Sequence, residues 1–135
     1  MVLLGLAGCS STPSSAGSSQ VATVEPTPSP AVQLVDVTKA VVLAADPSVI
    51  VVDVRTPAEF AGGHIARAQL VDFEAAGFAG RIAQLDRSAT YLVYCHSGNR
   101  SGQATAVMAT LGFKNVNNLA GGISAWQAAG APLVK

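Results

Sequence analysis

The sequence predicts an α/β domain with three layers, in which helices flank a central, mostly parallel sheet. Short apolar runs rich in β-branched residues alternate with segments of helical pattern, and no hairpin turn signals connect successive runs. Parallel strands need a crossover connection, usually a helix, so this alternation indicates βαβ units. The apolar half of the 135-residue chain is mostly Ala and Val, which suits closely packed elements, and the length fits one domain.

The chain begins with a short apolar stretch that ends at Cys9. Leu6-Ala7-Gly8-Cys9 resembles the lipobox of bacterial lipoproteins, in which the cysteine is lipidated and becomes the mature N-terminus. No Lys or Arg precedes Cys9 and the apolar run is short, so residues 1–9 form a partial signal. An upstream start codon or a trimmed chain would explain both defects. The alternative is an ordinary N-terminus with a chance cysteine.

Residues 10–30 have the composition of a disordered tether. They are mainly Ser, Thr, Pro and Ala with a single charge, Glu25, and such a segment cannot bury enough apolar surface to order itself. Its expected reach is of order 25–40 Å. No apolar run approaches the ~20 residues of a spanning helix, so anchoring would be by lipid alone. We therefore expect an extracytoplasmic protein, lipid-anchored to a bacterial membrane, with one domain over residues 31–135.

The first half of this domain contains the pattern of three strands and three helices. The strands are expected at Val32–Val35, at the β-branched run Val49–Val52, and around Ala68–Val71. The helices are expected at Val37–Ala45 after the cap Asp36, from Pro57 to Gly62-Gly63, and in the second half of Phe73–Leu85, where Phe78, Ile82 and Leu85 share a face. Thr56 and Glu59 form a capping box at the start of the second helix.

The second half repeats the alternation with two strands and two helices. The strands are expected at Tyr91–Tyr94 and Val116–Leu119, and the helices at Ser101–Leu111 and Ile123–Ala129. The first of these helices has an apolar stripe formed by Ala104, Val107, Met108 and Leu111, and Gly112 closes it. Gly121-Gly122 breaks the chain before the last helix.

Cys95 lies between a strand that ends at Tyr94 and a helix that begins near Ser101. Unpaired N–H groups converge at such a helix N-terminus and the helix dipole favours negative charge, so the cysteine would be held partly as thiolate. A buried structural cysteine is the bland alternative. Gly98, Asn99 and Arg100 argue against it, because a packed core would not take them. In parallel sheets reactive groups lie beyond the carboxyl ends of strands, where Cys95 is.

Three separated motifs resemble the rhodanese family of sulfurtransferases. They are Asp53-Val-Arg-Thr-Pro-Ala-Glu-Phe60 followed by Gly63-His-Ile65, the loop Cys95-His-Ser-Gly-Asn-Arg-Ser101, and Leu119-Ala-Gly-Gly-Ile-Ser-Ala-Trp126 with Ala129-Gly130 and Pro132 behind it. Their order and spacing match a single rhodanese domain over residues 31–135. One departure is visible, since the family often shows Pro-Gly-Ala where this chain has Ala66-Arg67-Ala68.

The resemblance implies a sulfurtransferase with Cys95 as its nucleophile. Cys95 would attack the outer sulfur of thiosulfate or a similar donor, release sulfite and become a persulfide, from which cyanide or a thiol takes the sulfur. Backbone N–H groups would hold the anionic sulfur, and the loop residues that bind it would be His96, Ser97, Gly98, Asn99, Arg100 and Ser101. The resemblance implies no cofactor, and a protein partner is not identified.

Two side chains of the loop have open roles. The Arg100 guanidinium either faces an anionic donor or braces the loop against an acid such as Asp53 or Glu59, and we favour the brace. His96 either helps to bind anions at the entrance or is merely exposed.

Loop length separates sulfur transfer from phosphate or arsenate chemistry. Related phosphatase and arsenate-reductase domains carry five residues between cysteine and arginine, whereas here four residues separate Cys95 from Arg100. The smaller ring suits a single sulfur atom. A sulfur carrier that receives persulfide from a partner protein is an alternative. An inactive rhodanese-like binding domain is disfavoured because such domains commonly lack the cysteine.

The remaining motif residues are expected to be structural. Asp53 and Arg55 would hold neighbouring loops by buried hydrogen bonds, with substrate contact by Arg55 as the alternative. His64 is expected in the scaffold and Trp126 in the core. No His, Cys, Asp and Glu cluster has metal-ligand spacing, so no metal is expected. Acidic and basic residues balance at eight each, which gives no electrostatic footprint for nucleic acid or an anionic membrane surface.

Overall fold

A single five-stranded sheet forms the centre of the computed structural model, which describes residues 31–135. The strands are β1 Val32–Val35, β2 Val49–Asp53, β3 Gln69–Leu70, β4 Thr90–Tyr94 and β5 Asn115–Leu119. They lie in the order β1-β5-β4-β2-β3, and every neighbouring pair is parallel. The predicted lipidation site Cys9 and the predicted tether, residues 10–30, lie outside the described residues.

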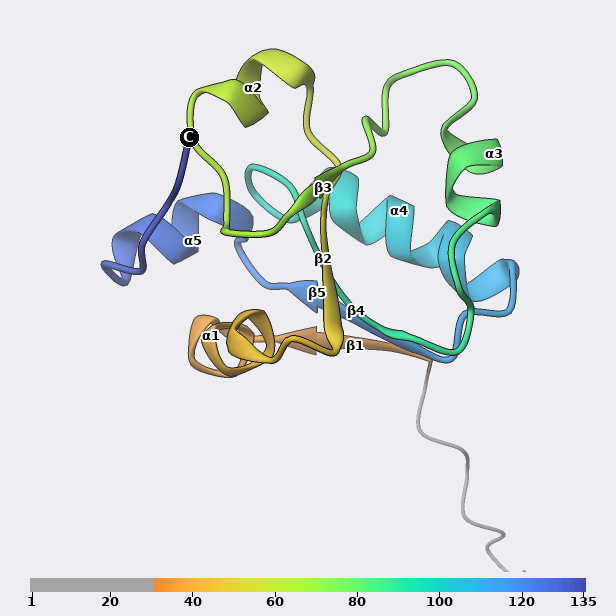
Figure 1. Cartoon of the computed structure of the whole chain (residues 1–135), viewed down its shortest axis with the longest axis horizontal. Helices are drawn as coiled ribbons and strands as arrows, with labels where there is room; N and C mark the ends of the chain where they lie inside the picture. The colour runs from red at the N-terminus through yellow and green to blue at the C-terminus, as the bar shows by residue number, and fades with distance from the viewer. Residues whose placement is uncertain (1–30) are drawn as a thin grey trace, which may run out of the picture.

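Helices cover both faces of this sheet, which confirms the predicted three-layer α/β architecture. They are α1 Val37–Ala45, α2 Pro57–Ala61, α3 Phe78–Ala83, α4 Asn99–Thr110 and α5 Gly122–Ala128. In Figure 1, α1 and α5 lie on one side of the sheet and α3 and α4 on the other. The short helix α2 follows the carboxyl end of β2 and lies beside the C-terminus, where His64 and Val134 form an isolated antiparallel bridge.

The position of β4 in the middle of the sheet explains why residues 91–94 are apolar without interruption. Tyr91, Leu92, Val93 and Tyr94 are all fully buried, because residues of alternating direction pack against helices on opposite faces. Tyr91 and Val93 face the cluster that includes α3 and α4, and Leu92 and Tyr94 face the cluster that includes α1 and α5. The strand therefore delivers the residue after Tyr94 at a fixed point on the carboxyl edge of the sheet.

The predicted helix caps are present. Asp36 Oδ1 accepts a hydrogen bond from the Lys39 N–H at 2.8 Å at the start of α1. Thr56 and Glu59 form the reciprocal capping box at the start of α2. This box fixes the direction of the Glu59 carboxylate, which also takes part in the site described below.

The predicted start of α4 near Ser101 is wrong by two residues. The helix begins at Asn99, because Gly98 adopts a left-handed conformation with φ of 102° and serves as the N-cap. Asn99 and Arg100 are therefore the first residues of the helix rather than part of the preceding loop. The strand expected around Ala68–Val71 is limited to Gln69–Leu70.

Arg67 lies in the segment Ala66-Arg67-Ala68, where the sequence departs from the Pro-Gly-Ala that the family often shows. It has φ of 66°, the only positive φ of a non-glycine residue among residues 31–135. The family often has glycine at this position, which adopts such a conformation without steric cost. The Arg67 guanidinium donates hydrogen bonds to the carbonyl oxygens of Ala44 and Asp46, where α1 ends. These bonds tie the strained turn to α1.

Candidate active site

The sulfur of Cys95 lies in a ring of backbone N–H groups at the carboxyl edge of the sheet. Cys95 follows β4 directly and is 1% exposed, and it is a free thiol. The Gly98 N–H donates to its Sγ at 3.0 Å. Because the loop ends at the N-terminus of α4, the helix dipole also favours negative charge at the sulfur. This is the placement that the sequence predicts.

Opposing effects set the pKa of the Cys95 thiol. Burial raises the pKa, but hydrogen bonds from the Ser101 hydroxyl and from the N–H groups of Ser101, Gly98 and Ser97 lower it. The net result is a pKa below the usual value of a thiol. A thiolate is the nucleophilic form of cysteine, so the loop favours the form that attacks an electrophile.

The N-terminus of α5 holds the other side of the loop backbone. The Ile123 N–H donates to the Cys95 carbonyl at 2.9 Å, and the Ser124 N–H donates to the His96 carbonyl at 3.1 Å. Gly122, with φ of 59°, lies so close that a Cβ there would be 2.5 Å from the Cys95 oxygen. With these two carbonyls engaged by α5, the loop N–H groups remain directed toward the sulfur.

Arg100 braces the loop against α2. Its Nη1 and Nη2 atoms each donate to the Glu59 carboxylate at 2.9 Å, and Glu74 Oε2 lies 3.7 Å from Nη1. Of the two partners considered from sequence, the structure therefore selects Glu59 and not Asp53. Hydrogen bonding from Arg100 lowers the pKa of Glu59 to about 2. The guanidinium is engaged in a bidentate pair and is turned to α2.

Asp53 and Arg55 form a buried ion pair where β2 ends. Arg55 Nη2 donates to Asp53 Oδ2 and to the Gly63 carbonyl, each at 2.7 Å, and Arg55 N–H donates to Asp53 Oδ1 at 2.9 Å. The exposed fractions of the two residues are 5% for Arg55 and 0% for Asp53. The pair joins β2 to the turn after α2, which is the loop-holding role expected from sequence.

An open hollow of about 310 Å³ lies next to the cysteine loop. Its walls come from α2 and the following turn, from α5 and from the loop, and they include Arg55, Glu59, Gly63, His96 and Gln127. His96 is exposed at this hollow, with Nε2 3.4 Å from Ser124 Oγ. The hollow has room for a small molecule, and its lining includes the positively charged Arg55 and the negatively charged Glu59.

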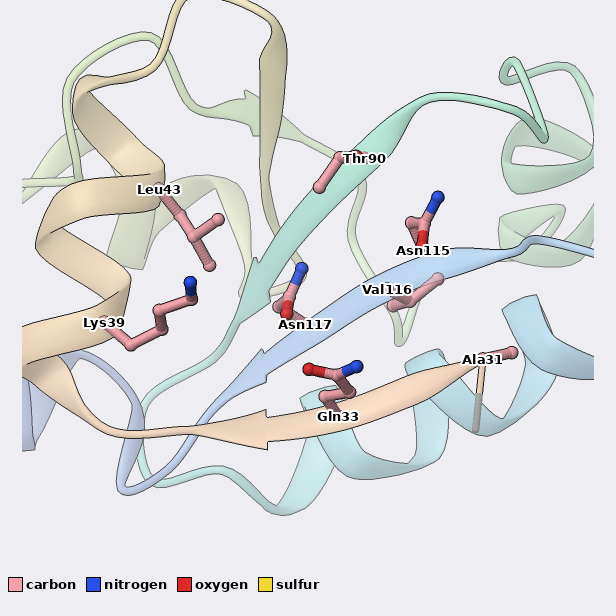
Figure 2. Close-up of a pocket in the computed structure, with 8 residues that line it drawn as sticks. All are labelled: Ala31, Gln33, Lys39, Leu43, Thr90, Asn115, Val116 and Asn117. Atoms are coloured by element: carbon pink, nitrogen blue, oxygen red, sulfur yellow. The ribbon is translucent and has the colours of Figure 1, made fainter. Parts of the chain in front are cut away.

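A second hollow, shown in Figure 2, is separate from the cysteine loop. It has a volume of about 190 Å³ and lies where β4 and β5 begin, at the edge of the sheet opposite to Cys95. Side chains of Lys39 and Leu43 from α1 face polar side chains of the strands across it, including Asn115 and Asn117. This second hollow shares no residue with the cysteine loop.

The other predicted residues occupy distinct places. Ser97 and Asn99 are exposed, and Asn99 Oδ1 accepts a hydrogen bond from Gln103 Nε2 at 3.3 Å. His64 stacks on Phe60 with ring centroids 3.7 Å apart, and Trp126 is 3% exposed. Within residues 31–135 no group of three or more His, Cys, Asp or Glu side chains is placed to hold a metal ion.

Sequence reasoning missed two contributors to the site. It treated Gly122 only as a chain break, although its missing Cβ permits the contact with the loop. It also gave no role to Asn118, whose Oδ1 accepts a hydrogen bond from Ser101 Oγ at 2.7 Å. The paired glycines were a visible signal for a close backbone approach. An asparagine inside a buried strand was a second signal, because buried polar groups need partners.

The structure defines a parallel α/β domain in which a cysteine follows a central strand and lies at the N-terminus of a helix, an arrangement suited to a nucleophilic thiol. The chain belongs to the rhodanese-like family, since the family described as Rhodanese-like domain matches residues 30–129. This confirms the resemblance seen in the three motifs.

Known relatives and structures agree with this assignment. A protein named Sulfurtransferase from Allochromatium vinosum is 39% identical over 92 residues, which cover 68% of this chain and 84% of that protein. Thiosulfate sulfurtransferase GlpE from Pseudomonas putida is 40% identical over 79 residues, covering 58% of this chain and 70% of GlpE. The crystal structure of a rhodanese-related protein from Thermoplasma volcanium has a TM-score of 0.67 and 28% identity, covering 76% of this chain and 97% of that one.

Replacing Gly122 with alanine should disable the cysteine loop. The new Cβ would lie 2.5 Å from the Cys95 oxygen, so the loop must move and the N–H groups lose their aim at the sulfur. The alkylation rate of Cys95 by iodoacetamide should fall by on the order of tenfold or more. The control is Gly130→Ala, which has a similar left-handed φ of 76° but meets nothing within 4 Å. A folded Gly122→Ala protein with the wild-type alkylation rate would contradict the proposed contact.

Glu59→Gln should reduce the acid sensitivity of stability. The folded-state pKa of Glu59, about 2, is below its ordinary value of 4.5, so its stabilisation is present above 4.5 and is lost as the pH falls toward 2. As Glu59 is protonated between these limits, the free energy of unfolding of the wild type should fall by about 1–2 kcal/mol more than that of Glu59→Gln. The difference is this small because solvent screens a partly exposed pair. Urea unfolding across this range measures the difference.

Glu74→Gln is the matched control for this experiment. Its carboxylate also faces Arg100, but at 3.7 Å and with 60% exposure of the side chain. The wild type and Glu74→Gln should therefore show nearly parallel pH dependences. Equal curves for the wild type and Glu59→Gln would refute the assigned brace.

Proposed function

We propose that this protein is an enzyme that transfers a sulfane sulfur through a persulfide on Cys95. The thiolate attacks the outer sulfur of thiosulfate, the sulfur–sulfur bond of the donor breaks, and sulfite leaves with the bonding electron pair. Cyanide or a thiol then attacks the outer sulfur of the persulfide, takes it up and regenerates the thiolate. The observation that carries this proposal is the Cys95 sulfur held by the Gly98 N–H at 3.0 Å at the start of α4.

The same N–H groups suit both states of the cysteine. A thiolate and a persulfide anion each carry a single negative charge, and each is stabilised by hydrogen-bond donors fixed in advance at its position. Relatives that are named Sulfurtransferase and Thiosulfate sulfurtransferase support a sulfur donor as the substrate class.

The state of Arg100 favours sulfur transfer over phosphate chemistry. A phosphate or arsenate site needs a guanidinium free to hold the oxyanion, whereas Arg100 forms a bidentate pair with Glu59. The four-residue gap between Cys95 and Arg100 also makes a small ring, as the sequence indicated. Both observations match a pocket for one sulfur atom.

We also propose that the protein is located outside the cytoplasm. Lipidation at Cys9 would anchor the protein to the outside of a bacterial membrane, with residues 10–30 as tether. All strands of the sheet are parallel, so Val32 at the start of β1 lies at the amino ends of the strands and the cysteine after β4 lies at their carboxyl ends. A tether attached at the amino ends would leave the Cys95 loop on the far side of the domain from its attachment. None of the helices in the described part of the chain is long and apolar enough to cross a membrane.

Incubation of the Cys9→Ser protein with thiosulfate tests the proposed chemistry. Intact-protein mass spectrometry should show one added sulfur atom, peptide mapping should place it on Cys95, and cyanide should remove it as thiocyanate. Cys95→Ser should remain folded and gain no sulfur. Failure of the wild-type loop to take up sulfur would overturn the proposal. Stable loading with little turnover by cyanide or thiols would favour the sulfur-carrier alternative.

A further inference from the structure

The Ser101 hydroxyl has more acceptors than it can serve. Ser101 is fully buried in the first turn of α4, and a hydroxyl group has a single hydrogen to donate. Its Oγ lies 2.7 Å from Asn118 Oδ1 and 3.2 Å from the Gly98 carbonyl oxygen. Hydrogen bonding from this hydroxyl to the sulfur is also one of the effects that lower the pKa of Cys95. The sulfur is therefore a third candidate acceptor for the same hydrogen.

Asn118 reaches Ser101 from the strand next to β4. It lies in β5 and is 8% exposed, and a Cβ at Gly102 would be 3.8 Å from its Nδ2, which places the amide against α4. The preceding residue, Asn117, has the same exposure but points to the opposite face of the sheet, into the hollow of Figure 2. Of the two oxygen acceptors, Asn118 Oδ1 is the nearer to the hydroxyl.

We propose that Asn118 is a positioning residue that competes with the Cys95 sulfur for the single hydrogen of the Ser101 hydroxyl. While the amide oxygen holds this hydrogen, the sulfur loses a donor. When the sulfur is a thiolate or a persulfide anion, the hydrogen turns to it, because hydrogen bonds to charged acceptors are stronger. Asn118 thereby limits how strongly the loop favours the anion. The inference rests on the proposed role of Cys95 as nucleophile.

The charged groups around Cys95 are all held elsewhere in the site. Arg100 from α4 is paired with Glu59 of α2, and Arg55 is paired with Asp53 of β2. His96 is exposed on the loop itself, and neither α5 nor β5 carries an ionisable side chain. A neutral substitution at Asn118 changes none of these pairs, so its effect on Cys95 would pass through Ser101.

Asn118→Leu, in the Cys9→Ser background, removes the competing acceptor while keeping the number and branching of the side-chain heavy atoms. The pH profile of Cys95 alkylation by iodoacetamide should move to lower pH, with a rate gain on the order of threefold to tenfold below the thiol pKa. Asn118→Asp should move the profile to higher pH, and by more in the presence of Ser101 than in a Ser101→Ala background. The added negative charge disfavours the thiolate in both backgrounds, whereas a carboxylate can hold the hydroxyl hydrogen only when Ser101 is present. A merely structural asparagine would give shifts that do not depend on the Ser101 hydroxyl.

Two further variants complete the test. In a Ser101→Ala background, Asn118→Leu should give no gain, because no hydroxyl hydrogen remains to be released. Asn117→Leu, with equal burial on the other face, should leave the alkylation profile unchanged. Thermal unfolding verifies that each variant is folded. If Asn118→Leu does not fold, the difference between the Asn118→Asp shifts with and without the Ser101 hydroxyl decides the case.

Several outcomes would overturn the inference. These are an unchanged or slower rate for Asn118→Leu, an unchanged or faster rate for Asn118→Asp, a gain that persists without the Ser101 hydroxyl, and an equal gain for Asn117→Leu. Alkylation reads the thiolate without any sulfur donor. The proposed competition for the hydrogen can therefore be refuted while sulfur transfer stands. Failure of sulfur transfer would appear separately, in the incubation with thiosulfate.

Discussion

The two hydrogen bonds from the start of α5 to the carbonyl oxygens of Cys95 and His96 are the constraint on which the site depends. A loop of small polar residues has many conformations, and few of them direct several N–H groups at one point. Once its carbonyls are engaged by Ile123 and Ser124, the remaining freedom of the backbone is small. The glycine at 122 permits this contact, since any side chain there would collide with the loop.

Other elements fix the same loop from different directions. The capping box of α2 orients Glu59, which receives Arg100 from the first turn of α4, and the pair of Asp53 and Arg55 ties β2 to the turn after α2. The two arginines of the site are therefore engaged in ion pairs that hold the scaffold. The sulfur itself is left to uncharged donors fixed in advance, an arrangement that stabilises one negative charge without reorganisation.

The sequence predicted best what depends on neighbouring residues. The cap at Asp36, the capping box of Thr56 and Glu59, and the apolar run of β4 follow from local chemistry, and the rhodanese motifs supplied the fold and the sulfurtransferase family. Contacts between distant segments were less accessible. The choice of Glu59 over Asp53 by Arg100, and the approach of Asn118 to Ser101, depend on the strand order. The early start of α4 depends on the sign of φ at Gly98, which a glycine does not reveal in sequence.

The central claim is that the loop holds Cys95 as a thiolate ready to take up sulfur. The most direct test is to measure the pKa of the Cys95 thiol in the folded Cys9→Ser protein from the ultraviolet absorbance of the thiolate across pH. We predict a pKa below that of the same thiol in the urea-unfolded protein, because the hydrogen bonds to the sulfur outweigh its burial. A pKa at or above the unfolded-state value, as burial without the hydrogen bonds would give, would contradict this prediction.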